Sequence, residues 1–407
     1  MKKVIYLSIF FALLLVFNTA CKGPTGPAGS QGDQGNPANP SAVVLSTPRF
    51  NSTTASAEIV WTINVDGNFS EYRLYRSDTP GVTESSTLVT TVTNRYSSFY
   101  VDVFGSKPTN YFYYKVYAYN IPGASTPSNE VILTGLYIFK LSFGSSGTGD
   151  GELDYPTDVA VDDSGNIYVA DGFNYRIQKF DSDGNYLDQW GSLGTGDGQF
   201  DRPSSIEYAP DGYLYVGDFG NNRIQIFDTD GNYIDKFSTT GSPGDSFIAE
   251  NGDIYVPDRT NHVVRWFDYT FAPVLTWGIL GSGNGQFNGP IDIGASLDGG
   301  RLYVLDSGNG RVQAFTNNGV YLSQFSGPGT APGQCDNCGG LAVDNYGLVY
   351  VTDWFEGMIQ IYDEYGGFIE EFVVPGISPG IWGVCFDIDN NLYVVDSWNN
   401  VVHVFGP

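Results

Sequence analysis

Hydrophobic and polar positions alternate along most of this chain in runs of five or six residues, separated by turn-forming Gly, Asp and Asn. A period of two residues is typical of β-strands that bury one face. One kind of run is different, because it is apolar on both faces and always ends in Tyr-Val-x-Asp. It lies at residues 168–171, 215–218, 255–258, 303–306, 350–353 and 393–396.

These endings recur every 40 to 48 residues, which is the length of a four-stranded sheet with its turns. In the first repeat the pattern predicts strands at residues 158–162, 166–171, 176–180 and 186–190. A strand that is apolar on both faces needs neighbouring sheets to cover it. The sequence therefore predicts an all-β fold with a six-bladed β-propeller over residues 136–407.

Two motifs accompany the repeats: Gly196-Asp-Gly-Gln-Phe200 before an inner strand, and Asn-x-Arg-Ile-Gln after a second strand. With these motifs, residues 137–407 resemble the NHL repeat family, in six copies. The resemblance implies that loops entering the inner strands and leaving the second strands share one face. Ligands of such propellers bind on that face, in or around the axial channel.

The last repeat stops after its third strand, at residues 401–405. Residues 136–143 alternate like a fourth, outer strand and precede the first inner strand. We therefore expect residues 136–143 to pair with the strand that ends at Phe405, so that both ends of the repeat region share one blade. This pairing would remove two unpaired sheet edges.

Residues 1–20 read as an export signal, with Lys2 and Lys3 before an apolar run. Cys21 directly after Thr-Ala resembles the bacterial lipobox, which implies a lipid on Cys21 and a place in the cell envelope, at the outer membrane or cell surface. Cleavage without a lipid is the alternative.

After Cys21, Gly recurs every third residue from 23 to 35, so residues 21–40 predict a collagen-like Gly-X-Y tether. We expect the protein to be a monomer; a trimer held together by a collagen-like triple helix is the alternative.

Residues 41–135 alternate in short runs, which is typical of a β-sandwich. Trp61 and the run Val116-x-Ala118-x-Asn120 give this segment a resemblance to the fibronectin type III domain. The resemblance implies a spacer or a docking module.

The chain has 19 Lys and Arg against 45 Asp and Glu, a formal net charge of −26. Such a surface repels phosphate backbones and anionic lipid head groups. We expect no nucleic-acid partner, and contact with a membrane only through an N-terminal lipid.

Large aromatic residues lie in the loops after the second strands, where core packing does not require them. Sugar rings and peptide side chains stack on such residues. We interpret this set as a ligand-binding arc; packing between adjacent loops is the alternative. It consists of Phe173, Phe219, Trp354, Phe355 and Trp398.

A second candidate site is the mouth of the axial channel. The positions that open the inner strands are Asp158, Ser205, Ser246, Asp292, Gly340 and Gly383. Asp158 and Asp292 belong to the first and fourth blades, so they should face each other and could hold a divalent cation or a polyol. A water-filled channel mouth is the alternative.

The aspartates that end the second strands have a structural interpretation. Three of them have an arginine five residues later, which predicts a carboxylate–guanidinium pair within the blade. These pairs are Asp171–Arg176, Asp218–Arg223 and Asp306–Arg311. For Asp258, Asp353 and Asp396 we expect the carboxylate to cap its loop through backbone amides.

Few residues suit catalysis. Cys335 and Cys338 are expected to form a small disulfide or to remain idle thiols, and His262 and His403 are too few for a three-histidine zinc site. We find no catalytic residue and no required cofactor. The sequence favours a non-catalytic envelope protein that recognises a protein, peptide or glycan; a metal-dependent hydrolase or lyase using the channel is the competing function.

Overall fold

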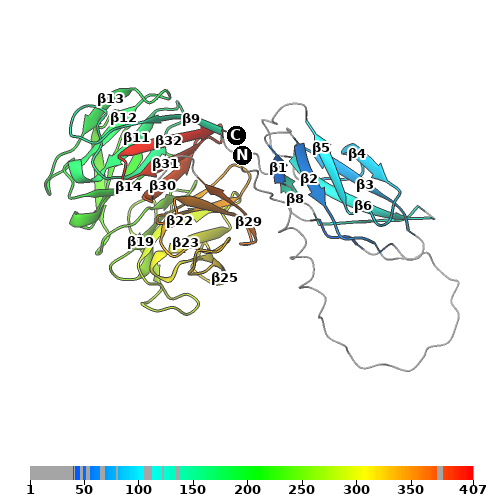
Figure 1. Cartoon of the computed structure of the whole chain (residues 1–407). Coiled ribbons are helices and arrows are strands. Elements are labelled where there is room, and N and C mark those ends of the chain that lie inside the picture. The colour runs from blue at the N-terminus through cyan, green and yellow to red at the C-terminus, as the bar shows by residue number, and fades with distance from the viewer. Residues whose placement is uncertain are drawn as a thin grey trace.

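The computed structural model of the chain describes residue 40 and residues 42–45, 49–51, 56–64, 69–78, 81–104, 112–121, 123–129, 131–133, 138–373 and 379–406. The predicted export signal, Cys21 and nearly all of the predicted tether lie outside these residues. No helix in the described part of the chain is long and apolar enough to span a membrane. The strands form two bodies, one from β1 to β8 and one from β9 to β32 (Figure 1).

The first body is a sandwich of two sheets, with strand orders β1-β2-β5 and β4-β3-β6-β7, and β8 also pairs with β6. Its strands are β1 (Arg49–Asn51), β2 (Ser56–Val60), β3 (Phe69–Ser77), β4 (Thr87–Val92), β5 (Phe99–Val103), β6 (Phe112–Asn120), β7 (Ser125–Pro127) and β8 (Val131–Leu133). Trp61, Tyr72 and Val116 belong to the core between the sheets. Arg76 and the Tyr114 hydroxyl both donate to Asp102, which satisfies this nearly buried carboxylate.

The second body consists of six four-stranded antiparallel sheets, here called blades one to six. Blade one consists of β10 (Pro156–Val161), β11 (Ile167–Asp171), β12 (Arg176–Phe180) and β13 (Tyr186–Trp190), and blade two of β14 (Pro203–Tyr208), β15 (Leu214–Asp218), β16 (Arg223–Phe227) and β17 (Tyr233–Ser238). Blade three consists of β18 (Phe247–Ile248), β19 (Ile254–Asp258), β20 (Val263–Phe267) and β21 (Pro273–Trp277), and blade four of β22 (Pro290–Ala295), β23 (Arg301–Asp306), β24 (Arg311–Thr316) and β25 (Tyr321–Ser326). Blade five consists of β26 (Cys338–Val343), β27 (Val349–Asp353), β28 (Met358–Tyr362) and β29 (Phe368–Val373), and blade six of β30 (Ile381–Phe386), β31 (Leu392–Asp396), β32 (Val401–Gly406) and β9 (Ile138–Phe143). Short 3₁₀ turns follow three of the second strands: η2 (Gly172–Asn174), η3 (Phe219–Asn221) and η4 (Ser307–Asn309).

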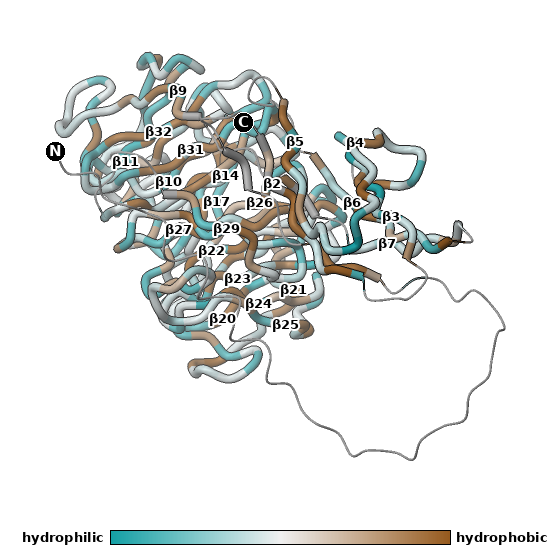
Figure 2. Tube along the Cα trace, turned by 45° about the vertical axis from the view of Figure 1, so that its right-hand side comes forward, coloured by the Kyte–Doolittle hydropathy of each residue, from teal (hydrophilic) through white to brown (hydrophobic). Residues whose placement is uncertain are grey.

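Every neighbouring pair of blades shares an apolar core. Tyr168 of blade one packs with Ile206 of blade two, and four further clusters join blades two to six in order. A sixth cluster joins blade six to blade one, so the blades close into a ring. The second strand of each blade is buried on both faces, as its sequence predicts. In Figure 2 apolar, brown segments follow many of the strands.

The two ends of the repeat region meet in blade six, which confirms the predicted closure. β9 is the outer strand of this blade and pairs with β32, with Phe143 opposite Val402 and Leu141 opposite Val404. Figure 1 shows β9 beside β32. The Phe143 ring lies 4.7 Å from the Phe180 ring of blade one, so β9 also seals the joint between the last and first blades.

The predicted pairs between strand-ending aspartates and arginines are confirmed. Arg176, Arg223 and Arg311 donate from Nε to Asp171, Asp218 and Asp306 over 2.7 to 2.8 Å. Each arginine also donates to carbonyl groups of the loop that leads into its own blade. In blade one these are the carbonyls of Thr148, Gly149 and Glu152.

Blade three differs from the expectation that Asp258 only caps its loop. Asp258 accepts from the amide of Asn261, as expected, but Arg265 also donates to it over 2.8 Å. Arg265 stands seven residues after the aspartate, where four other blades have a glutamine: Gln178, Gln225 and Gln313 donate to the equivalent carboxylate, and Gln360 accepts from the entering loop. In blades five and six the expectation is confirmed, because Asp353 and Asp396 accept from loop amides.

The closure can be tested with two substitutions on one strand. Phe143→Ala removes a ring that is 8% exposed and should lower the free energy of unfolding by about 3 to 5 kcal/mol. Phe139→Ala is the matched control: the Phe139 ring is 49% exposed, so its removal should lower the free energy of unfolding much less. Denaturant unfolding of both variants measures this, and equal small losses would show that β9 does not close the ring.

Candidate functional site

The loops that leave the second strands of five blades, together with residues at the start of inner strands, surround one cavity of about 490 Å³ at one face of the ring. We call this cavity the aromatic basin. Each blade contributes at least one side chain to its wall. In blade order these include Phe173, Phe219, Arg259, Ser307, Trp354 and Trp382.

Five aromatic rings line the basin, and they pack against one another. The Tyr155 ring stacks on Phe173 at 4.8 Å, and Trp354 meets Trp382 edge to face at 6.1 Å. Phe173 remains 49% exposed despite these contacts. The rings therefore pack against one another and also remain open to a ligand. A ligand-binding arc and packing between adjacent loops are thus compatible interpretations of these residues.

The five aromatic residues of the expected arc fall into two groups. Phe173, Phe219 and Trp354 line the basin. Phe355 and Trp398 do not line it, but their rings lie 4.6 and 5.1 Å from Trp354 and are about half exposed. All five side chains are thus part of one face, with Phe355 and Trp398 at its edge.

Four further aromatic or charged residues of the basin were missed in the sequence. Tyr155 and Arg202 come directly before the prolines that begin β10 and β14, and Trp382 lies in β30. Arg259 follows Asp258, which is the same place that Phe219 and Trp354 hold after their own aspartates. Aligning the repeats on these aspartates could have found Arg259.

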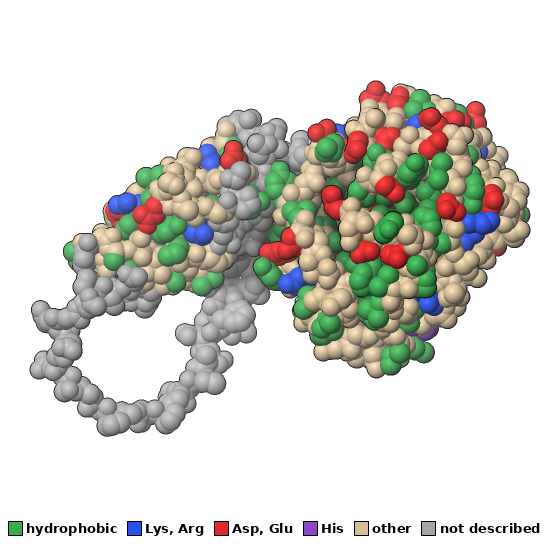
Figure 3. Space-filling model, turned by 180° about the vertical axis from the view of Figure 1, so that it is seen from behind, with side chains coloured by type: hydrophobic (Ala, Val, Ile, Leu, Met, Phe, Trp, Pro, Cys, Tyr) green, Lys and Arg blue, Asp and Glu red, His purple; other side chains and the backbone are tan. Residues whose placement is uncertain are grey.

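The basin has the opposite charge from the rest of the molecule. Arg202 and Arg259 line it, and none of the described residues in its wall is Asp or Glu. The whole chain has 45 acidic residues against 19 basic ones, and acidic side chains are scattered over the face shown in Figure 3. Burial raises the pKa of Tyr155, and the nearby Arg259 charge partly opposes this shift.

The predicted channel mouth lies directly beneath the basin. Asp158 and Asp292 line one cavity of about 40 Å³, so the structure brings the two carboxyls together. Each also accepts an amide of the next blade, Asp158 from Ile206 at 2.8 Å and Asp292 from Leu341 at 2.5 Å. Both aspartates therefore join neighbouring blades in addition to facing the channel.

The hydroxyl groups expected at the channel mouth have different environments. Ser205 is buried and donates to the Gly244 carbonyl at 3.1 Å, so its hydroxyl is used within the fold. Ser246 lines a lower cavity of about 220 Å³, and its hydroxyl has no hydrogen-bond partner among the described residues. Of the two expected glycines, Gly383 lines the channel cavity, and Gly340 donates its amide to Thr352 at 2.7 Å.

Two more carboxyls face the channel, and sequence reasoning missed them. Asp245 lines both lower cavities, and Glu207 lines the larger one. Burial raises the pKa of Asp158, Asp245 and Asp292 well above the usual range, and each gains a further increase from a neighbouring carboxylate. Burial together with the Asp292 charge raises the pKa of Glu207 to about 8.

The channel does not have the geometry of a metal site. Among the described residues, no three His, Cys, Asp or Glu side chains lie so that they could hold a metal ion. His262 accepts the Gly289 amide at 2.9 Å, and His403 lies 3.7 Å from Asp396. Both histidines thus have structural contacts outside the channel.

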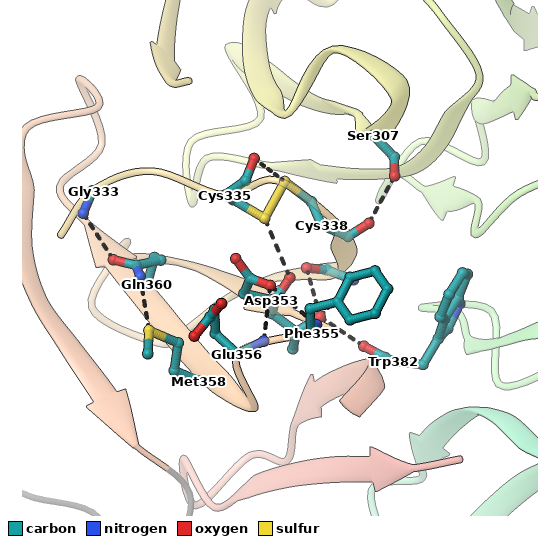
Figure 4. The surroundings of a disulfide bond; sticks show 12 residues. Ser307, Gly333, Cys335, Cys338, Asp353, Phe355, Glu356, Met358, Gln360 and Trp382 are labelled. Carbon is teal, nitrogen blue, oxygen red and sulfur yellow. Dashed lines mark hydrogen bonds between the residues drawn. A yellow bond between two sulfur atoms is a disulfide. The ribbon is translucent and has the colours of Figure 1, made fainter. Parts of the chain in front are cut away.

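Cys335 and Cys338 are joined in a disulfide at the side of the basin (Figure 4). Both cysteines are buried, and Cys338 lines the basin wall. The Ser307 hydroxyl donates to the Cys338 carbonyl at 2.8 Å and links blade four to blade five. The disulfide therefore belongs to the framework of the site.

Comparison with known proteins finds NHL repeats in the ring. The NHL repeat family matches residues 153–180, 200–227 and 287–315, in blades one, two and four. Protein lin-41 of Caenorhabditis elegans is 49% identical over 49 residues, 12% of this chain and 4% of that protein. RING finger protein nhl-1 of the same organism is 35% identical over 77 residues, 19% of this chain and 8% of that protein. The chain thus spans less than a tenth of either relative.

Solved structures show a similar fold at low sequence identity. A protein of unknown function from Bacteroides thetaiotaomicron has a TM-score of 0.56 at 14% identity, with 91% of this chain and 99% of that chain covered. A streptogramin B lyase has a TM-score of 0.48 at 11% identity, with 88% and 92% covered. At these identities the likeness concerns the fold alone.

The channel carboxyls predict a stability that falls as pH rises. The pKa of Glu207 is raised from 4.5 when unfolded to about 8 when folded, so the folded state holds the proton more tightly. The contribution of this carboxyl to the free energy of unfolding is therefore most favourable below about pH 4.5 and is lost as the pH rises to about 8. Glu207→Gln removes this dependence and should reduce the difference in unfolding free energy between pH 5 and pH 8 by on the order of 2 kcal/mol.

The control for this measurement is Glu250→Gln, which removes an exposed carboxylate and the same formal charge. Urea unfolding at several pH values compares the two variants with the unchanged protein. If both variants show the same pH slope, general repulsion among surface charges explains the dependence and the channel does not.

Proposed function

We propose that this chain is a non-catalytic binding protein of the bacterial cell envelope, which recognises a protein, peptide or glycan through the aromatic basin. One observation carries the proposal: side chains from all six blades line a single cavity of about 490 Å³, and five aromatic rings, of which Phe173 is 49% exposed, form part of its wall. This volume lies within the range of ligand pockets, about 300 to 1,000 Å³. Exposed rings gathered at a concave site are typical of recognition surfaces.

The rest of the chain fits the presentation of such a propeller outside the cell. We propose that residues 1–20 direct export, that Cys21 carries a lipid, and that residues 21–40 form a tether. For residues 41–135 we propose a fibronectin type III spacer, and the strand orders β1-β2-β5 and β4-β3-β6 support this assignment. The net charge of −26 supports a role without nucleic acid, and we propose a monomer.

A hydrolase or lyase that uses the channel is the competing function. The observation that favours it is the group of buried carboxyls beneath the basin, whose raised pKa values would suit proton transfer. The expected metal-dependent form of this enzyme has less support, because the described residues offer no group of three metal ligands. Recognition therefore has the stronger case.

The binding function predicts loss of affinity when the aromatic rings are removed. A glycan array and a pull-down from envelope extract would first supply a ligand for the full chain. Trp354→Ala combined with Trp398→Ala should then weaken its binding at least about tenfold, since aromatic anchors often contribute 2 kcal/mol or more. Tyr269→Ala is the control, because this ring is 72% exposed on a turn between β20 and β21. Unchanged binding in the double variant would reject the basin as the recognition site.

Metal analysis separates binding from metal-dependent catalysis. The purified full chain, after exchange into metal-free buffer, should contain no stoichiometric calcium or zinc by mass spectrometry. The same measurement on Asp158→Asn combined with Asp292→Asn is the comparison. One equivalent of metal that disappears in this variant would support the enzyme instead.

A further inference from the structure

The two arginines of the aromatic basin are available to a ligand. Arg202 has Asp201 as its ion-pair partner among the described residues, at 3.7 Å, and both side chains are about half exposed. Exposed pairs of this kind contribute little. Arg259 is exposed and makes no side-chain hydrogen bond or ion pair with the described residues. By contrast, Arg176, Arg223 and Arg311 are buried in the pairs with strand-ending aspartates.

The position of Arg202 combines charge with an apolar surface. Its guanidinium lies 5.2 Å from the centre of the Phe219 ring, and both residues line the basin. Stacking on an aromatic ring orients the planar guanidinium while its N–H groups remain free to donate. A ligand that rests on the aromatic wall would therefore meet a fixed, forked donor suited to a carboxylate.

The deeper part of the site presents different chemistry. Thr157, Phe219 and Trp382 line both the basin and the small cavity beneath it, so the two are neighbours. The deeper walls include the carboxyls of Asp158, Asp245 and Asp292, and Arg259 reaches this cavity from the basin. One oxygen of Asp245, Oδ1, accepts no hydrogen bond from an N–H donor or a hydroxyl among the described residues, and this carboxyl lies beside that of Asp158. A group that donates a hydrogen bond would satisfy it.

We propose that the ligand of the basin is an acidic sugar, a pyranose ring with a carboxylate, presented as a unit of a glycan. This inference rests on the proposed binding function. The apolar face of the ring stacks on the aromatic wall, the carboxylate pairs with Arg202 and Arg259, and ring hydroxyls donate toward the carboxyls below. All three kinds of contact are present in one continuous site, and each matches a different part of an acidic sugar.

An acidic peptide fits this arrangement less well. Its carboxylates could pair with the arginines, but a further carboxylate that entered the small cavity below would lose its hydration beside Asp158, Asp245 and Asp292. Sugar hydroxyls are neutral donors and avoid the cost of burying a charge. The mixed pattern of cationic rim and acidic floor therefore favours the sugar.

The test uses three probes with the full-length protein: oligomers of galacturonic acid, the same oligomers with their carboxylates methyl-esterified, and a glutamate-rich peptide. Titration calorimetry measures each dissociation constant. The acidic oligomer should bind at least about tenfold more tightly than its ester, and the difference should shrink in high salt. Arg202→Gln combined with Arg259→Gln should remove this difference while leaving the weaker binding of the ester.

A matched control is Arg301→Gln, because the Arg301 guanidinium lies 5.1 Å over the Tyr365 ring, far along β23 from the basin end of that strand. It should leave every dissociation constant unchanged. Equal binding of acid and ester, tighter binding of the peptide, or no binding of either oligomer would each overturn the proposal. If an envelope ligand still depends on Trp354 and Trp398 in any of these cases, the binding function stands and only the sugar assignment fails.

Discussion

The structure depends on a buried carboxylate at the end of the second strand of each blade. These six aspartates are at most 1% exposed, and a buried charge without partners would cost several kcal/mol. In blade one, Asp171 accepts the amide of Asp154 in the entering loop, the side chain of Asn174 in the leaving loop, and Arg176. One charge thus ties together the two loops that build the ligand face.

Because the aspartates fix the loop backbone, the side chains of the ligand face can differ from blade to blade without a change in loop geometry. The residue directly after the aspartate varies from blade to blade while the aspartate does not: Gly172, Phe219, Arg259, Ser307, Trp354 and Ser397. Because the loops are fixed by buried hydrogen bonds, their side chains are held in place before a ligand arrives. Preorganisation of this kind reduces the entropy lost on binding. The framework can therefore present aromatic rings and arginines at one cavity.

The acidic surface and the basic basin both follow from where the propeller places its charged side chains. Most acidic side chains lie in turns and on outer strands, where they are solvated, whereas the channel carboxyls are buried and keep their protons more readily. The basin therefore has a cationic rim above carboxyls that are weakly charged. The ligand is thus expected to need both a negative group and neutral hydrogen-bond donors.

The sequence was sufficient for the blades and the closure, because these follow from strand period and from a count of strands. It identified three basin aromatics, since Phe173, Phe219 and Trp354 follow the Tyr-Val-x-Asp endings. It did not reveal the partner of Asp258, because Arg265 stands at the glutamine position of the Asn-x-Arg-Ile-Gln motif and the expected arginine position, five residues after the aspartate, is Val263. Glu207 lies two residues after Ser205, so strict alternation along the strand could have placed it in the channel.

Asp245 was harder to find, because β18 has only two residues and offers no register to read. The Tyr155 and Arg202 positions were hidden for a different reason. Both have a positive φ, of 52° and 62°, just before the inner strand. Side-chain direction at such a residue departs from the strand pattern, so no periodicity predicts that these side chains reach the basin.

The buried aspartates should hold the ligand face in its binding geometry even when no ligand is bound. Hydrogen–deuterium exchange of the free protein tests it at the amides of Asp154, Asp201 and Asn288, which donate to Asp171, Asp218 and Asp306. These loop amides should exchange as slowly as amides in the second strands. Exchange as fast as that of the exposed turn at Asp183 would contradict it, and would mean that the basin forms only when a ligand binds.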